Sequence, residues 1–334
     1  MAIDLLSLTP HKVSRDLSGY ITYIFGAGGT GKTTLASQMD RALLVACERG
    51  YNALPNVMAQ DVTSWSEMKQ VVRELKKPAV QETFKSICID TIDIAADLCE
   101  KYICNREGVE RLGDIPWGGG YKLMKKEFEE TFRAITQMNY ALFFISHAKD
   151  KVFKREDGSE YNQIVPSLAP SYNEIIRNMS DLQGYAHQVR HEDGTSEVML
   201  TLRSPNGEIE CKSRFKYIEP EISFNYESLS KALADAIDKE AKVNGGQFVT
   251  DESAPKTKEK QLDFESMMDE FKELTHKIQK ATGDDFKTKW APKIVEITNK
   301  YLGVGKKVSD CTAAQAEQVE LILLDLKDLI GQGL

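Results

Sequence analysis

The chain has 334 residues, of which 41% are hydrophobic and 28% charged, so it has enough apolar side chain for a core and is not disordered as a whole. Lys and Arg total 43 against 51 Asp and Glu, and this net charge of −8 excludes a general basic coat for wrapping nucleic acid. The sequence has no apolar run near the ~20 residues that span a bilayer, no signal-like N-terminus and no CxxC pair, which predicts a cytoplasmic protein with no membrane partner.

Buried strands alternate with helices through the first half of the chain. Short β-branched and aromatic runs predict strands at residues 20–25, 42–47, 84–89 and 141–146. Helical spacing predicts helices from Lys32, over residues 64–77 with a Ser64–Glu67 capping box, and along apolar stripes at residues 92–102 and 121–138. Continuous apolar strands that alternate with helices predict a parallel sheet covered on both faces.

The following segment predicts antiparallel strands. Candidate strands in residues 151–165 flank the polar tip EDGSE, and residues 184–190 and 197–203 flank HEDGT, which is a hairpin signal. A Pro-Asn-Gly turn at residues 205–207 precedes a candidate strand at 209–215. This half of the large domain is therefore expected to be mostly antiparallel.

The composition divides the chain near its C-terminal end. Residues 244–260 are rich in Gly, Ser, Thr, Pro and Lys, which predicts a flexible linker after a core of residues 1–243. In residues 261–334 a helical stripe runs from Phe264 to Ile278, and Thr312 with Gln315 forms a capping box before the last helix. A small C-terminal helical domain is expected.

The strongest chemical signal is a phosphate-binding loop that matches GxxxxGK[ST] between a predicted strand and a predicted helix. Its glycines let the backbone fold around phosphate oxygens, and the N-terminus of the following helix adds positive potential. Lys32 would reach the β- and γ-phosphates, and Thr33 would ligate Mg²⁺. The sequence thus predicts ATP and Mg²⁺ as cofactors, held by Gly26, Ala27, Gly28, Gly29, Thr30, Gly31, Lys32, Thr33 and Thr34.

Two carboxylates are candidates for the same site. Asp90 ends the predicted strand 84–89 as in a Walker B strand, where it would hold the magnesium through water; the alternative is an ordinary Asp at a strand end. The next residue is Thr91 rather than Glu, so a hydrolytic base has to lie elsewhere. Glu48, directly after the strand 42–47, is the leading candidate to polarise the attacking water, and the alternative is a surface Glu.

Three further residues could act in catalysis. His147 ends the strand 141–146, where it could sense the γ-phosphate or be a partly buried His bonded to the backbone. Lys212 and Arg214 share one face at a period of two and could reach a neighbouring subunit's nucleotide site, or form a solvated pair on an edge strand.

A local basic cluster follows His147. It could grip the phosphates of a single strand while Tyr161 stacks on a base, or it could simply keep a hairpin soluble. The cluster consists of Lys149, Lys151, Lys154 and Arg155.

The motifs GAGGTGKT, CERG, SICIDT, ISHAKD and CKSRF, in this order, resemble a RecA-type core. They are more narrowly similar to the phage-encoded RecA-like ATP-binding proteins of single-strand annealing and recombination, as is WGGGYKLMKKEFEETFRAI, and the resemblance covers roughly residues 18–227. It implies an α/β RecA-like P-loop NTPase core, with a mainly parallel sheet and an antiparallel extension, plus the helical domain. It implies that strand 141–146 lies between the P-loop and Walker B strands, which places His147 near the γ-phosphate.

The resemblance also assigns roles. It implies Glu48 as the base, Lys212 and Arg214 as fingers acting in trans, and residues 148–166 at the position of a DNA-binding loop. The expected function is an ATP-hydrolysing recombination protein on single-stranded DNA, supporting annealing or strand exchange. It would form a homo-oligomer with nucleotide at subunit interfaces and work with a single-strand binding or annealing protein.

Three alternative functions remain open. One is a ring-forming helicase or helicase loader, which the Lys212–Arg214 pair would also suit. The second is a small-molecule kinase with the same P-loop, for which an Arg-rich lid and an acceptor site are not apparent in the sequence. The third is a module that holds ATP without hydrolysis and needs no Glu48.

Overall fold

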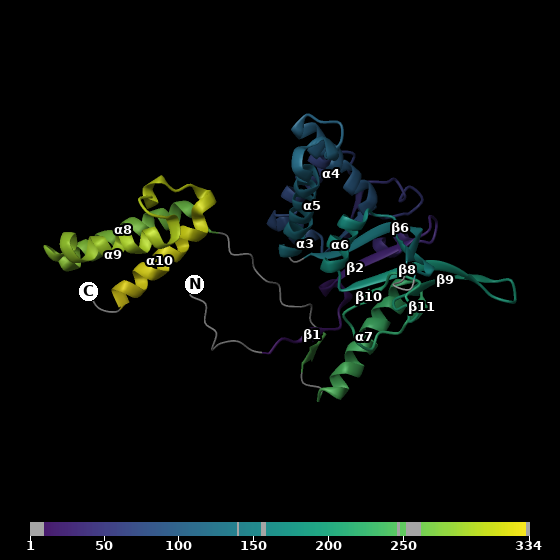
Figure 1. Ribbon diagram of the computed structural model, residues 1–334. Coiled ribbons are helices and arrows are strands. Elements are labelled where there is room, and N and C mark those ends of the chain that lie inside the picture. The colour runs from purple at the N-terminus through teal and green to yellow at the C-terminus, as the bar shows by residue number, and fades with distance from the viewer. Residues whose placement is uncertain (1–9, 139, 155–157, 246–247, 252–261, 332–334) are drawn as a thin grey trace. The chain divides into compact units, whose positions relative to one another are not determined.

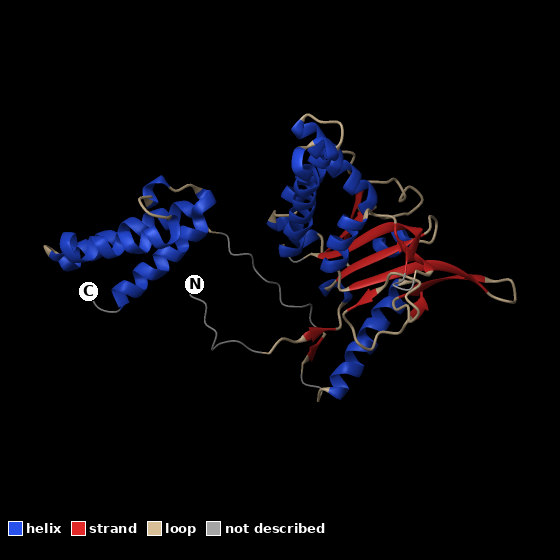
Figure 2. Ribbon diagram, viewed as in Figure 1, coloured by secondary structure: helices blue, strands red, loops and turns tan. Residues whose placement is uncertain are grey.

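The computed structural model describes residues 10–138, 140–154, 158–245, 248–251 and 262–331 (Figure 1). The chain divides into two compact units, Met1–Lys258 and Glu259–Leu334. The first contains a sheet with helices on its faces, and the described part of the second is helical (Figure 2).

Parallel strands form the centre of the first unit. They are β2 (Ile21–Gly26), β3 (Ala42–Ala46), β4 (Ala59–Asp61), β5 (Ser86–Asp90) and β6 (Ala141–Lys154). Their order across the sheet is β4-β3-β5-β6-β2, and every neighbouring pair is parallel. Strand β6 therefore lies between the strand before the P-loop and the strand that ends in Asp90. This order defines the RecA-like α/β fold and confirms the predicted fold class.

Helices cover both faces of this sheet, as predicted. One face packs against α2 (Trp65–Glu74), α4 (Ile92–Glu107), α5 (Gly119–Gln137) and α6 (Pro170–Met179), and the other against α1 (Lys32–Ser37) and α7 (Tyr226–Val243). Phe143 and Phe144 are neighbours in β6, and both are fully buried, in opposite cores. Because each of residues 141–146 is buried in a core, this half of the strand carries no alternation of apolar and charged residues.

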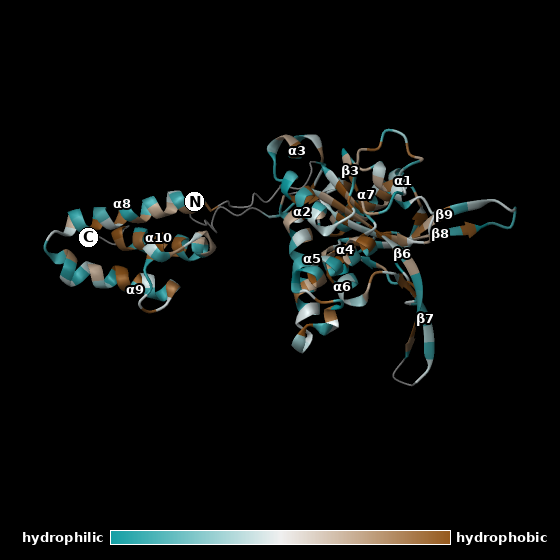
Figure 3. Cartoon of the chain, turned by 90° about the horizontal axis from the view of Figure 1, so that it is seen from above, coloured by the Kyte–Doolittle hydropathy of each residue, from teal (hydrophilic) through white to brown (hydrophobic). Residues whose placement is uncertain are grey.

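The antiparallel extension is also present. Strand β8 (Leu182–Arg190) runs parallel to β2 and antiparallel to β9 (Ser196–Thr201), which pairs with β11 (Glu221–Ser223). Strand β7 (Glu160–Pro166) pairs antiparallel with the second half of β6. The β6–β7 and β8–β9 hairpins project from the unit as two arms (Figure 3).

Two predicted strands have different lengths. Strand β6 runs to Lys154 instead of ending at residue 146, because residues 148–154 pair with β7. The expected strand at 209–215 is reduced to β10 (Lys212–Ser213), which pairs with β8. The reason is local hydrogen bonding, since Ile209 N donates to Ser204 Oγ and Cys211 N donates to Ile209 O.

Two short elements, a helix and a strand, were not predicted from the sequence. Helix α2 ends at Glu74 rather than at residue 77, and a separate helix, α3 (Pro78–Thr83), starts with proline at its first position. Within the expected linker of residues 244–260, β12 (Val249–Thr250) pairs with β1 (Val13–Ser14) and so belongs to the first unit. Residues 246–247 and 252–260 of this linker lie outside the described residues.

The second unit has its own apolar core. Helices α8 (Phe264–Thr282), α9 (Ala291–Leu302) and α10 (Ala316–Gly331) bury Ile278, Val319, Ile322 and Leu326 completely. The Thr312–Gln315 capping box is present, in the turn that precedes α10. Within the described residues of both units, no helix is long and apolar enough to cross a membrane.

Candidate active site

The P-loop joins β2 to α1. An added Cβ at Gly26 would lie 2.3 Å from the carbonyl oxygen of Ala186 on β8, so only glycine permits this close approach of two parallel strands. Gly31 has φ +86° as the N-cap of α1, a left-handed conformation that glycine adopts without strain. The loop geometry thus depends on these two glycines.

A cavity of about 320 Å³ lies between the P-loop, the carboxyl ends of β3 and β5, and the middle of β6. It is lined by Lys32, Thr33 and Thr34 of the P-loop segment, by Glu48 and Asp90 at the two strand ends, and by His147 within β6. Parallel strands bring their carboxyl ends to one edge of a sheet, which explains how residues far apart in sequence meet here.

Lys32 and Asp90 are charged groups that the fold buries. Lys32 is 6% exposed, and its Nζ donates to the carbonyl oxygens of Gly26 at 2.9 Å and Ala27 at 2.7 Å. Burial lowers the pKa of Lys32, and the Asp90 carboxylate opposes this shift. Asp90 is 3% exposed, and burial raises its pKa. A phosphate entering the pocket would meet a desolvated ammonium, where electrostatic attraction is stronger than in water.

The Thr33–Asp90 pair suits a magnesium ion. Thr33 Oγ1 donates to Asp90 Oδ2 at 2.7 Å, and a Cβ added at Gly50 would lie 3.3 Å from that hydroxyl oxygen, so the glycine keeps space beside the pair. Thr91 Oγ1 is buried beside the pocket and has no hydrogen-bond partner among the described residues. Mg²⁺ usually takes one or two protein ligands plus phosphates and waters, which this donor set allows.

Glu48 and His147 face each other at the mouth of the pocket. Glu48 Oε2 lies 3.2 Å from His147 Nε2, and both side chains are about half exposed. Glu48 N donates to the carbonyl oxygen of Asp90 at 3.0 Å, which fixes the backbone of Glu48 beside β5. A carboxylate held in this way can accept a proton from a water in the pocket, and the His can report on the same space.

Lys212 and Arg214 lie outside this pocket. Lys212 Nζ donates to the carbonyl oxygen of Arg177, and Arg214 Nη2 donates to that of Asn178 at 3.1 Å, so both cations reach the C-terminal end of α6. Arg214 Nη1 also lies 3.1 Å from Asp181 Oδ1. The two residues share a face, as their spacing predicts, but the fold does not bring them to their own chain's nucleotide site.

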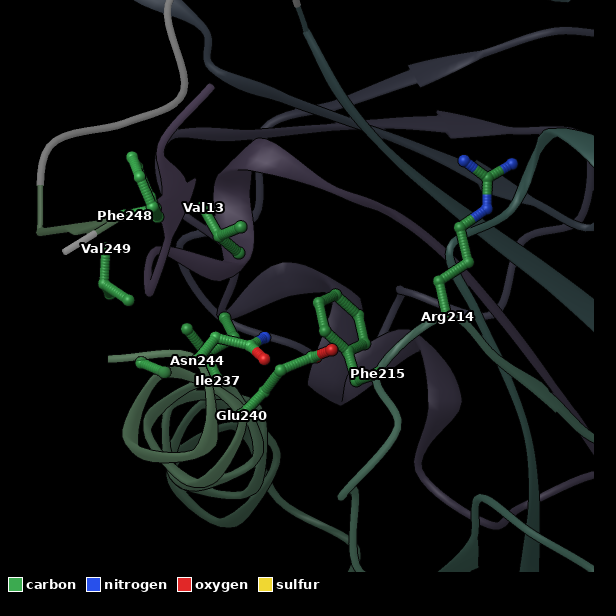
Figure 4. A pocket seen from close by; sticks show the side chains of 9 residues that line it. Val13, Arg214, Phe215, Ile237, Glu240, Asn244, Phe248 and Val249 are labelled. Carbon is green, nitrogen blue, oxygen red and sulfur yellow. The ribbon is translucent and has the colours of Figure 1, made fainter. Parts of the chain in front are cut away.

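Arg214 also lines a second, mostly apolar cavity of about 260 Å³. Val13, Phe215, Ile237 and Phe248 line it as well (Figure 4). The guanidinium of Arg214 points away from these side chains (Figure 4), toward Asn178 and Asp181.

The basic cluster lies on the β6–β7 hairpin but does not share one face. Strand alternation puts Lys149 and Lys151 on one side with Phe153, and Lys154 on the other, where it lies 3.5 Å from Glu160. Arg155 lies outside the described residues. Lys154 thus lies on the opposite face of the hairpin from Lys149 and Lys151, because odd and even positions of a strand face opposite ways.

The face with Lys149 and Lys151 has an aromatic pair. The Tyr161 and Phe153 rings stack with centroids 5.6 Å apart, and Lys151 Nζ lies 4.6 Å from the Phe153 centroid. Lys149 Nζ donates to the carbonyl oxygen of Ser167 at 2.7 Å. Both rings are partly exposed, and cations beside accessible aromatic rings are typical of surfaces that contact single-stranded nucleic acid.

Sequence reasoning missed a polar cluster next to the pocket. Asp93, in the first turn of α4, accepts hydrogen bonds from Ser146, His147 and Ser167. These residues form no motif, and the only sequence signal is an Asp three residues after a Walker B Asp. In the loop after β3, Glu48 was predicted, but Ala53 and Leu54, which also line the pocket, were not.

The P-loop, the sheet order and the hydrogen bond between Thr33 and the buried Asp90 define the first unit as a P-loop NTPase with a RecA-like core. Residues 18–215, more than half of the chain, match the family described as AAA domain, and the chain belongs to this family of ATPases.

A relative in the same class matches the chain from end to end. The SPbeta prophage-derived uncharacterized protein YorG of Bacillus subtilis (strain 168) is 30% identical over 346 residues, which covers 99% of this chain and 100% of that protein. Because the match also covers the second unit, the two proteins share both units.

Two solved structures are similar at 13% identity and a TM-score of 0.35 each. The KaiC-like protein from Pyrococcus horikoshii OT3 matches over 60% of this chain and 92% of its own. The flagellar accessory protein FlaH from Methanocaldococcus jannaschii matches over 62% of this chain and 85% of its own.

Proposed function

We propose that the chain is a phage-encoded ATPase that binds single-stranded DNA and supports recombination, by annealing or strand exchange, in the host cytoplasm. The observation that carries the proposal is that one strand serves both sites. His147 of β6 lines the nucleotide pocket, and Lys149 and Lys151 follow on the same strand. Lys151 is four residues beyond His147, roughly 13 Å along the strand. DNA on the hairpin would thus contact the same strand that contributes His147 to the pocket.

The proposed chemistry is hydrolysis of ATP to ADP and phosphate. The P-loop amides and Lys32 hold the β- and γ-phosphates, and Thr33 and Asp90 hold Mg²⁺, which when bound neutralises charge on the phosphate oxygens. Glu48 takes a proton from a water molecule while the oxygen of that water attacks the γ-phosphorus. The bond between the γ-phosphorus and the oxygen that bridges it to the β-phosphate breaks, and ADP leaves. His147, 3.2 Å from Glu48, senses whether the γ-phosphate is present.

Completion of the site in trans is the second element of the proposal. Lys212 and Arg214 lie against the C-terminal end of α6 and do not line their own chain's pocket within the described residues. Arranged at a subunit interface, they would reach a neighbour's γ-phosphate and stabilise transition-state charge. The chain would then act as a homo-oligomer, together with a single-strand binding or annealing protein.

A ring-forming helicase or helicase loader is the second candidate, because two cations that lie outside their own chain's pocket suit a ring as well. Two assays separate the candidates. One measures annealing of complementary dye-labelled oligonucleotides, and the other measures unwinding of a forked duplex, each with and without Mg-ATP. The proposal expects faster annealing and no unwinding, with Glu48→Gln changing the nucleotide dependence. ATP-driven unwinding without annealing would favour the ring motor and overturn the proposal.

A further inference from the structure

We propose that Asp93 is a positioning residue that fastens the base of the β6–β7 hairpin to the nucleotide site, so that the hairpin responds to bound nucleotide. The response of the hairpin to nucleotide is argued from the contacts of Asp93, whereas the claim that DNA binds the hairpin rests on the proposed function. The contacts join three segments that are distant in sequence. They are the first turn of α4, the middle of β6 and the residue after β7.

The Asp93 carboxylate accepts from three donors. Its Oδ1 accepts from Ser146 Oγ at 3.0 Å and from Ser167 Oγ, and its Oδ2 accepts from His147 N at 3.3 Å. Hydrogen bonds to an ionised acceptor are about twice as strong as neutral ones. One side chain thus fixes the backbone of His147, whose ring lines the pocket, and holds Ser167 at the same time.

Ser167 is the other half of the connection. Its N donates to the carbonyl oxygen of His147 at 2.8 Å, and its own carbonyl oxygen accepts from Lys149 Nζ at 2.7 Å. The first pair of the hairpin is Ala148 with Pro166, and these residues directly follow His147 and directly precede Ser167. Both strands of the hairpin are therefore anchored to Asp93 at the base of the hairpin.

This geometry predicts coupled movement. If the γ-phosphate draws on the His147 ring, the backbone of His147 and Ser167 should shift together. His147 N and Ser167 Oγ are both bonded to Asp93, and Ser167 N is bonded to the carbonyl oxygen of His147. The shift reaches Lys149 through Ser167. Coupling between two sites is reciprocal for binding, so DNA on the hairpin would in turn alter nucleotide affinity.

A purely structural role for Asp93 is the competing explanation. A negative side chain in the first turn of a helix stabilises that helix through its dipole, whatever the hairpin does. The test therefore uses Ser167→Ala, which removes one hydroxyl at the hairpin base and leaves Asp93, α4 and the pocket in place. Ser167→Thr keeps the hydroxyl. Thr195→Ala is the matched control, because it removes a hydroxyl bonded to a carboxylate, Asp193, on the β8–β9 hairpin.

The first readout needs no DNA. Hydrogen exchange is measured over residues 148–154 and 160–166, with Mg²⁺ and a non-hydrolysable ATP analogue or without nucleotide. The wild type and the Thr195→Ala and Ser167→Thr variants should show altered hairpin exchange with nucleotide. Ser167→Ala should lose this change while its P-loop amides remain protected. An unchanged response in Ser167→Ala, or no hairpin response in the wild type, would overturn the proposal.

The second readout is stimulation of ATP hydrolysis by single-stranded DNA. Ser167→Ala should keep the basal rate but lose about 5-fold or more of the stimulation, a typical size for coupling between sites. Full stimulation in Ser167→Ala would contradict the connection. If DNA fails to stimulate the wild type, the proposed function fails instead, and the exchange measurement still decides on Asp93.

Discussion

The P-loop pocket and the β6–β7 hairpin share strand β6, yet they hold their charges in opposite ways. In the pocket, Lys32 and Asp90 are almost fully buried and bonded to protein atoms. On the hairpin, the side chain of Lys154 is 76% exposed and lies beside Glu160. Groups that would touch the nucleotide act through their geometry, so their loss should have steep effects, whereas exposed charges on the hairpin act through a screened potential and should give graded, salt-dependent effects.

The largest effect should come from Arg214, which would extend the pocket across a subunit interface. Arg214→Ala should slow turnover by about 10³-fold or more, because a finger that stabilises transition-state charge contributes at least that much. Steady-state phosphate release measures it, with exposed Arg190→Ala as control. Mixing Arg214→Ala with Lys32→Ala protomers should restore some activity. Full wild-type activity of a monomer at high dilution would rule out action in trans.

Glu48→Gln tests the mouth of the pocket. It should slow hydrolysis by about 10²–10⁴-fold, since the amide cannot accept the proton of the attacking water. Nucleotide affinity should stay near normal, because the carboxylate does not hold the phosphates. Single-turnover hydrolysis and equilibrium binding separate the two quantities. Near-normal hydrolysis would remove Glu48 from the mechanism.

Lys32→Ala tests the buried side of the comparison. Losing one or more charge-assisted hydrogen bonds to phosphate should weaken binding of ATP by about 10–150-fold. Titration calorimetry with a non-hydrolysable analogue gives the affinity, and a thermal melt shows that the variant is folded. Unchanged affinity in a folded variant would place the nucleotide elsewhere.

The hairpin should respond more weakly and in a salt-dependent way. Lys151→Ala should lower the slope of log affinity against log salt by about 0.7, which is the loss of one phosphate contact on a single strand. Lys154→Ala is the matched control on the opposite face, already beside Glu160, and should change the slope less. Equal slopes for both variants and the wild type would show that DNA binds another surface.

The smallest effect concerns the second unit, which has its own core. A chain ending at Lys258 should bind ATP normally while partner-dependent annealing is impaired. A chain ending at Gly246 also loses β12 and the ion pair between Arg15 and Asp251, so it should melt at a lower temperature. Loss of ATP binding in the folded longer chain would show that the second unit is part of the ATPase.

Site residues that are adjacent in the sequence were easier to predict than those that the fold brings together. The P-loop was predictable because its residues are adjacent and each has a required role. The contacts of Asp93 were not, since Ser146 and Ser167 lie 53 and 74 positions away and polar residues without motif spacing give no signal. The length of β6 was missed for a related reason, because residues 149–154 are mostly charged and lie outside the core, so they lack the apolar pattern of a buried strand.

The central claim is that ATP hydrolysis in the pocket is coupled to single-stranded DNA. The most direct measurement is the steady-state rate of phosphate release at saturating Mg-ATP, with and without a single-stranded oligonucleotide, compared with the same sequence as duplex. We predict a several-fold rise with the single strand, lost in Glu48→Gln and reduced as salt increases. A rate that is the same in the absence and presence of single-stranded DNA, in a protein that binds ATP, would contradict the claim.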